Sequence, residues 1–90
     1  MNPRVDILVV DDEQTMRDFL EASLSSRFAV TTASGGVEAL EILRRGSFDV
    51  VLSDIQMPGG SGMDLLAGIR REIDPKPLII MMTAFGTIEQ

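Results

Sequence analysis

The chain has 90 residues, a formal net charge of −6 and a hydrophobic content of 44%, which is typical of one small globular domain and excludes a disordered chain. It contains neither cysteine nor histidine, so disulfides, thiolate metal sites and imidazole catalysis are excluded. The acidic balance argues against nucleic-acid binding, and no apolar run is long enough to span a membrane, so we expect a cytoplasmic protein.

The first predicted elements are a strand and a helix. Val5 to Val10 is apolar almost throughout, which predicts a strand covered on both faces. From about Gln14 to Ser25, apolar residues recur at spacings of three and four, which predicts an amphipathic helix. Its expected buried stripe is Met16, Phe19, Leu20 and Leu24, with Arg17, Asp18 and Glu21 on the other side.

The next pair is a weaker strand and a second helix. Phe28 to Ala33 is only partly apolar, which predicts a strand at the edge of a sheet. Ser34 is the expected N-cap of a helix from Val37 to Arg45, and Gly46 is its expected end. The expected buried stripe of this helix is Val37, Leu40 and Leu43.

A third strand is predicted from Asp49 to Asp54, and a loop from Met57 to Gly60. A third helix follows from about Ser61 to Ile73, and Leu78 to Met82 is entirely apolar, which predicts a central fourth strand. The segment from Gly86 to Gln90 predicts the start of a fourth helix. The apolar residues of the third helix are Met63, Leu65, Leu66 and Ile69.

The alternation of strands and helices predicts an α/β fold with a doubly wound parallel sheet and right-handed crossovers. Ligands of such sheets bind outside the carboxyl ends of the strands. Asp11, Asp12, Asp54 and Thr83 each lie at the carboxyl end of a predicted strand. We therefore expect these four residues, from separate segments, to meet at one edge of the sheet.

Three carboxylates at one edge repel each other and need a cation. Each aspartate alone has an ordinary interpretation as a solvated strand end, and Asp12 also as a helix N-cap. Together, Asp11, Asp12 and Asp54 offer the hard oxygen ligands that suit Mg²⁺.

The order Val9-Val10-Asp11-Asp12-Glu13, Ser53-Asp54-Ile55-Gln56-Met57-Pro58, Gly62 and Met82-Thr83-Ala84 resembles the receiver domain of bacterial response regulators. The resemblance covers essentially the whole chain and implies a flavodoxin-like receiver fold. It implies that Asp54 accepts a phosphoryl group from the phosphohistidine of a sensor histidine kinase. It also implies that Asp11, Asp12, Asp54 and the main-chain carbonyl of Gln56 hold Mg²⁺, and that the Thr83 hydroxyl contacts the phosphoryl group.

The chain departs from the family in one respect. Receivers place an essential lysine at the end of a fifth strand, whereas the only lysine here, Lys76, precedes the predicted fourth strand. We therefore expect residues 1–90 to form a receiver domain that is incomplete at its C-terminal side, with four strands, three helices and the start of a fourth, and to be phosphorylated poorly. The fourth strand would then have an exposed edge, through which we hypothesise self-association unless the chain is part of a longer one.

Three functional interpretations stay open. The leading one is a receiver that switches an output such as transcription, because the segment from Thr83 to Glu89 resembles receivers joined to ATPase and DNA-binding effector domains. The alternative is a Mg²⁺-dependent phosphotransferase or phosphatase with an aspartyl-phosphate intermediate. Such enzymes typically carry Asp-x-Asp on one strand, whereas the acids here lie on two. The third is a degenerate receiver used only for protein contact, although all three aspartates are present.

Overall fold

A computed structural model describes residues 4–57, 60–83 and 86–89, with side chains described for residues 4–55 and 62–82. These ranges contain three helices and seven strands, two of which have only two residues each. In chain order the elements are β1 (Val5–Val10), α1 (Gln14–Leu24), β2 (Phe28–Ala33), α2 (Gly36–Arg45), β3 (Val50–Asp54), β4 (Gln56–Met57), β5 (Gly60–Ser61), α3 (Gly62–Glu72), β6 (Leu78–Thr83) and β7 (Gly86–Glu89).

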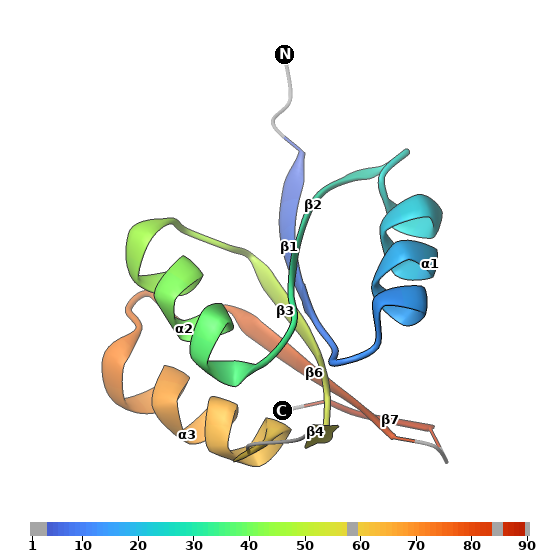
Figure 1. Cartoon of the computed structure of the whole chain (residues 1–90). Coiled ribbons are helices and arrows are strands. Elements are labelled where there is room, and N and C mark those ends of the chain that lie inside the picture. The colour runs from blue at the N-terminus through green and yellow to red at the C-terminus, as the bar shows by residue number, and fades with distance from the viewer. Residues whose placement is uncertain (1–3, 58–59, 84–85, 90) are drawn as a thin grey trace.

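The main sheet has the strand order β2-β1-β3-β6-β7. The first four strands of that order are parallel, with α1 on one face and α2 and α3 on the other (Figure 1). This confirms the predicted doubly wound α/β fold of the flavodoxin type and the predicted edge position of β2. The chain runs outward from β1 to β2 and then returns to β3 on the other side of β1, so the strand order reverses between β1 and β3. Ligands bind at such a reversal in open α/β sheets.

The segment after β6 differs from the prediction. It forms β7, antiparallel to β6, instead of the start of a fourth helix. The pairing from Thr83↔Gly86 to Ile80↔Glu89 gives partners to main-chain groups that β6 would otherwise leave open. The expectation of an exposed edge at β6 is therefore wrong, because β6 lies between β3 and β7. The ends of the predicted loop at 57–60 also differ, because Met57 and Gly60 belong to β4 and β5, which pair with each other.

The buried core lies between the sheet and the two helices α2 and α3. Alternate residues of β1, β3 and β6 point into it, as expected for the two-residue period of a strand. In α3, the predicted positions Leu65, Leu66 and Ile69 are buried, whereas Met63 is exposed. In α2, Leu43 is buried and Leu40 half-buried, but Val37 is 75% exposed. The strand residues of the core are Leu8, Val10, Ala33, Val51, Ile79 and Met81.

Helix α1 packs through a face that only partly matches the predicted one, since Leu20 and Leu24 lie on it and Met16 and Phe19 do not. Phe19 is 63% exposed and Met16 is also exposed, so both were wrongly placed in the buried stripe. The half-buried residues of this helix are Arg17, Leu20 and Leu24, at spacings of three and four. The side of α1 that faces the sheet therefore begins with an arginine. None of the helices in the described ranges has the length and hydropathy needed to cross a bilayer.

A glutamate in the first turn of α2 binds the residue before the helix N-cap. Gly35, not the predicted Ser34, is the N-cap, and it has no side-chain hydrogen bond. The Glu38 carboxylate accepts hydrogen bonds from the main-chain amide of Ser34 at 2.6 Å and from its hydroxyl at 3.1 Å. Gly46 ends the helix as predicted, and its amide donates to the Ile42 carbonyl. The carboxylate thus fixes the turn between β2 and α2.

Candidate functional site: a carboxylate cluster at the strand ends

Three carboxylates meet where β1 and β3 end. Asp11 and Asp12 directly follow β1, and Asp54 is the last residue of β3. Because Val10 pairs with Ser53, the two strands bring these acids to the same edge of the sheet. One carboxylate oxygen from each of the three residues lies within 4.8 Å of the others. The convergence predicted from the sequence is therefore present in the structure.

Asp11 is the most firmly held of the three. It is only 4% exposed, whereas Asp54 is half-buried and Asp12 exposed. Its amide donates to the Ala33 carbonyl at 3.1 Å, and its Oδ1 accepts a hydrogen bond from the Glu13 amide at 2.9 Å. The chain therefore stays in sheet register up to Asp11 and then turns into α1 around its carboxylate.

The electrostatics of the cluster favour a cation. Burial raises the pKa of the Asp11 carboxyl above its ordinary value, and the nearby carboxylates of Asp54 and Asp12 raise this pKa further. The Glu13 amide and the Arg17 guanidinium act in the opposite direction on the same pKa. A buried carboxylate with two acidic neighbours is stabilised in its charged form when a cation neutralises the group.

The donor set fits Mg²⁺. This ion takes oxygen ligands, retains several of its waters and is usually bound through only one or two carboxylates. The cluster offers one buried, one half-buried and one exposed carboxylate. A bound ion could therefore contact the protein on one side and keep water on the other.

Two further predicted site residues lie close by in the backbone. Gln56 begins β4, two residues after Asp54. Thr83 is the last residue of β6, and it follows Met82, the pairing partner of Asp54. The side chains of Gln56 and Thr83 lie outside the described part of the chain, so the metal contact of Gln56 and the phosphoryl contact of Thr83 stay predictions.

Two contacts at this site were not predicted from the sequence, although Gly62 belongs to the motif and Arg17 was placed on the outer side of its helix. Gly62, at the start of α3, donates its amide to the Ile55 carbonyl at 2.5 Å, directly beyond Asp54. Arg17 donates through Nη1 to the main-chain carbonyl of Asp11 at 2.6 Å. The spacing of Arg17 from Leu20 and Leu24 was the available signal for an inward-facing arginine.

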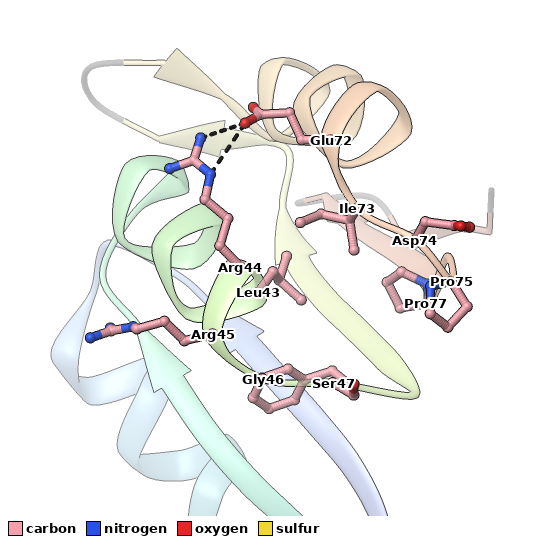
Figure 2. Close-up of a pocket in the computed structure, with 11 residues that line it drawn as sticks. Leu43, Arg44, Arg45, Gly46, Ser47, Glu72, Ile73, Asp74, Pro75 and Pro77 are labelled. Carbon is pink, nitrogen blue, oxygen red and sulfur yellow. Dashed lines mark hydrogen bonds and ion pairs between the residues drawn. The ribbon is translucent and has the colours of Figure 1, made fainter.

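A hollow of about 320 Å³ lies at the opposite edge of the sheet, beyond the ends of α2 and α3 (Figure 2). Arg44 donates to Glu72 Oε1 through Nη2 at 2.7 Å and through Nε at 3.2 Å across its rim. Segments that lead into β3 and β6 line the hollow, so it lies at the amino ends of these strands. Because doubly wound sheets bind ligands at the carboxyl ends, the carboxylate cluster is the candidate site.

Lys76 also lies at that opposite edge. It precedes β6, and its Nζ donates to the Ile73 carbonyl at the end of α3. Its position agrees with the expectation that it does not replace the family's lysine.

Comparison with known proteins places the chain beside response regulators. A family model described as the response regulator receiver domain matches residues 7–90. Chemotaxis protein CheY-3 of Vibrio cholerae is 40% identical over 93 residues, which cover all of this chain and 72% of CheY-3. Response regulator protein PilR of Pseudomonas aeruginosa is 39% identical over 83 residues, which cover 91% of this chain but only 18% of PilR.

A solved structure of response regulator protein TrrA from Thermotoga maritima, in complex with Mg(2+)-BeF, is also similar. It has a TM-score of 0.81 and 40% identity, with 89% of this chain and 70% of TrrA covered. TrrA has also been solved in complex with histidine kinase ThkA; that structure gives a TM-score of 0.81 and 38% identity, with 91% of this chain and 71% of the other covered.

Proposed function

We propose that this chain, which belongs to the response regulator receiver domain family, accepts a phosphoryl group on Asp54 from a sensor histidine kinase in a Mg²⁺-dependent reaction. Receiver domains are phosphoacceptors of two-component signalling. The observation that carries the assignment to Asp54 is the 4.8 Å grouping of its carboxylate with those of Asp11 and Asp12. Asp54 is also the acid at the end of β3, the strand next to the reversal in strand order.

Phosphoryl transfer to Asp54 requires only one covalent step from the protein. An Asp54 carboxylate oxygen forms a bond to phosphorus while the phosphorus–nitrogen bond of the donor phosphohistidine breaks and its imidazole leaves. Positioning and charge neutralisation provide most of the catalysis in such a transfer. Asp11 and Asp12, with Asp54 and the main-chain carbonyl of Gln56, would hold Mg²⁺, which when bound neutralises charge on the phosphoryl oxygens.

The same proposal gives Thr83 the role of a switch contact. Its hydroxyl would donate to a phosphoryl oxygen on Asp54 and would find another partner in the unmodified protein. Its place at the end of β6, next to β3, supports this role. A contact with two alternative partners is what a phosphorylation switch requires.

The partners are also part of the proposal. The solved complex of TrrA with ThkA supports a histidine kinase as the phosphoryl donor. The match to PilR, whose length this chain spans by only 18%, supports an effector domain in a longer protein and an output such as transcription. We propose that residues 4–89 bind no nucleic acid, in keeping with the net charge of −6 of the chain.

Intact-mass spectrometry after incubation with a small phosphoramidate donor tests the assignment. We expect slow, Mg²⁺-dependent addition of one phosphoryl group that hydroxylamine removes, as expected for an acyl phosphate. D54N should abolish the modification. D74N, which removes an exposed acid at the opposite edge, should be modified at the same rate as the wild type. Equal modification of D54N, or a wild-type chain that is never modified, would refute the proposal.

A further inference from the structure

We propose that Arg17 is a positioning residue for the carboxylate cluster, and that its guanidinium fixes the peptide between Asp11 and Asp12 so that both carboxylates are presented to Mg²⁺ together with Asp54. The inference rests on the proposed function and deepens it. It concerns a residue whose sequence context indicated an outward-facing charge and which the structure places on the inner side of α1.

The guanidinium links the end of β1 to the first turn of α1. Nη1 donates to the Asp11 carbonyl at 2.6 Å, and Nη2 donates to Gln14 Oε1 at 2.6 Å. Gln14 in turn donates through Nε2 to Asp18 Oδ1 at 2.7 Å. Because the planar guanidinium presents its donors in a fixed fork, these contacts restrain direction as well as distance.

Arg17 completes the restraint of Asp11. The Asp11 amide donates to the Ala33 carbonyl, its carboxylate accepts from the Glu13 amide, and its carbonyl accepts from Arg17. The contact with the Glu13 amide closes a ring that contains the peptide between Asp11 and Asp12, and the contact with Arg17 holds the carbonyl of that same peptide from outside the ring. Asp12 is exposed, so little packing holds its side chain. The orientation of the peptide that precedes it therefore determines the direction in which the Asp12 side chain leaves the main chain.

The burial of Arg17 supports a specific role. Every other arginine or lysine with a described side chain is exposed, whereas Arg17 is half-buried. Partial burial of a charge is costly unless the charge is paired. Here the cost is offset by the hydrogen bond to the Asp11 carbonyl and by nearby carboxylates. The positive charge of Arg17 acts to lower the pKa of both the Asp11 and the Glu38 carboxyl.

Two possible effects of Arg17 on metal binding have opposite signs, which makes the proposal testable. As a positioning residue, Arg17 strengthens Mg²⁺ binding, because it holds the ligands in place. As a mere positive charge beside the cluster, it would weaken Mg²⁺ binding by repulsion. Substitution therefore separates the two effects by the direction of the change in affinity.

Calorimetric titration of the full chain with Mg²⁺ is the first measurement. We expect R17M to weaken Mg²⁺ binding by roughly tenfold, the scale seen when a group that orients metal ligands is removed. R17K keeps the charge without the fork, and we expect it to bind weakly as well. R45M, which removes an exposed arginine from the end of α2, should bind like the wild type. Tighter or unchanged binding in R17M would overturn the proposal.

Hydrogen exchange of the metal-free protein is the second measurement. We expect the Glu13 amide, which donates to Asp11 Oδ1, to exchange faster in R17M, while the exchange of core amides in β1 and β3 stays unchanged. Unchanged exchange at Glu13 would overturn the positioning role. A wild-type chain that binds no Mg²⁺ would overturn the proposed function instead, and the Glu13 exchange rate would then decide the role of Arg17 by itself.

Discussion

Gly62 lies directly against the main chain of Asp54. A Cβ atom at Gly62 would come within 2.4 Å of the Asp54 carbonyl oxygen and 2.9 Å of Ile55 Cα. Both of these atoms belong to the backbone and have little freedom to move away. The beginning of α3 therefore approaches the end of β3 so closely that a side chain at position 62 would displace the backbone of Asp54 or Ile55.

Substitution of Gly62 should damage both stability and the site. We expect G62A to lower the free energy of unfolding by about 2 kcal/mol, as is typical of overpacking against fixed atoms, and to slow the modification of Asp54. The matched variant is G68A, also in α3, whose Cβ would meet Leu40 Cδ1 at 2.8 Å. That atom ends a flexible side chain, and alanine favours the helix by up to about 1 kcal/mol. Urea denaturation followed by circular dichroism should show a clearly smaller change for G68A, and equal losses would contradict this account.

Removal of the Asp11 charge should stabilise the metal-free protein at neutral pH. The pKa of Asp11 is raised in the folded state, chiefly by burial, so the folded protein binds this proton more tightly than the unfolded chain. Protonated Asp11 therefore stabilises the fold relative to charged Asp11. This stabilisation is fully present below the unfolded pKa of about 3.9 and is lost as the pH rises through the higher folded pKa. D11N should therefore unfold at a higher temperature than the wild type at pH 7 in EDTA.

The difference between D11N and the wild type should shrink as the pH falls through the raised folded pKa of Asp11, and it should change no further below the unfolded pKa of about 3.9. Added Mg²⁺ should stabilise the wild type more than D11N, because binding to the folded state alone raises stability. Thermal unfolding at several pH values, with and without Mg²⁺, measures both effects. A D11N protein less stable than the wild type in EDTA at pH 7 would count against the described electrostatics.

Glu38 should stabilise α2 at neutral pH and lose this effect in acid. The amide and hydroxyl of Ser34 lower the pKa of the Glu38 carboxyl through hydrogen bonds. Its contribution to stability is therefore present above the unfolded pKa of about 4.3 and is lost as the pH falls through the lower folded value. E38Q should reduce stability at pH 7 by about 0.5 kcal/mol, the lower range for a capping contact at an exposed helix end.

The matched control for E38Q is E41Q, which changes an exposed glutamate on the same helix. It should leave stability nearly unchanged at pH 7. Denaturant titrations at pH 7 and pH 3 measure both variants. The proposed role of the contact between Glu38 and Ser34 is wrong if E38Q and E41Q have the same stability at pH 7.

Phe19 and Leu65 should respond very differently to truncation. Phe19 is largely exposed, whereas Leu65 is buried between α3 and the sheet. F19A should therefore change the free energy of unfolding by no more than about 0.5 kcal/mol, and L65A should lower it by about 2–5 kcal/mol. Urea denaturation compares the two variants. A large loss in F19A would show that α1 packs through Phe19, as its apolar spacing first indicated.

The parts of the fold that the sequence predicted correctly are those with local signals. β1 is a largely apolar run followed by two aspartates, and β3 is one that ends in Asp54, so the ends of both strands and the meeting of Asp11, Asp12 and Asp54 were predictable. The inner face of α1 was only partly predictable. Met16 and Phe19 fit the helical period as well as Leu20 and Leu24 do, and the choice of Arg17 over them depends on the carbonyl of Asp11, which is a tertiary contact.

The strand β7 had no local signal. The sequence of its segment is compatible with the first turn of a helix, and its antiparallel pairing depends on the open side of β6. The close contact of Gly62 with Asp54 was equally invisible in the sequence, because a glycine that opens a helix and a glycine that accommodates a neighbouring backbone look the same. Local patterns therefore predicted the cluster itself but not the contacts that Arg17 and Gly62 make beside it.

The position of β1 between β2 and β3 has a consequence for ligand affinity. Its final residues are hydrogen-bonded on both sides before any ion arrives, so the conformational freedom of the chain that carries Asp11 is lost during folding and not during binding. A cation that binds here would therefore find the main chain around Asp11 already ordered. Its affinity would depend mainly on two opposing terms, the cost of removing its hydration water and the gain from neutralising the repulsion between the carboxylates.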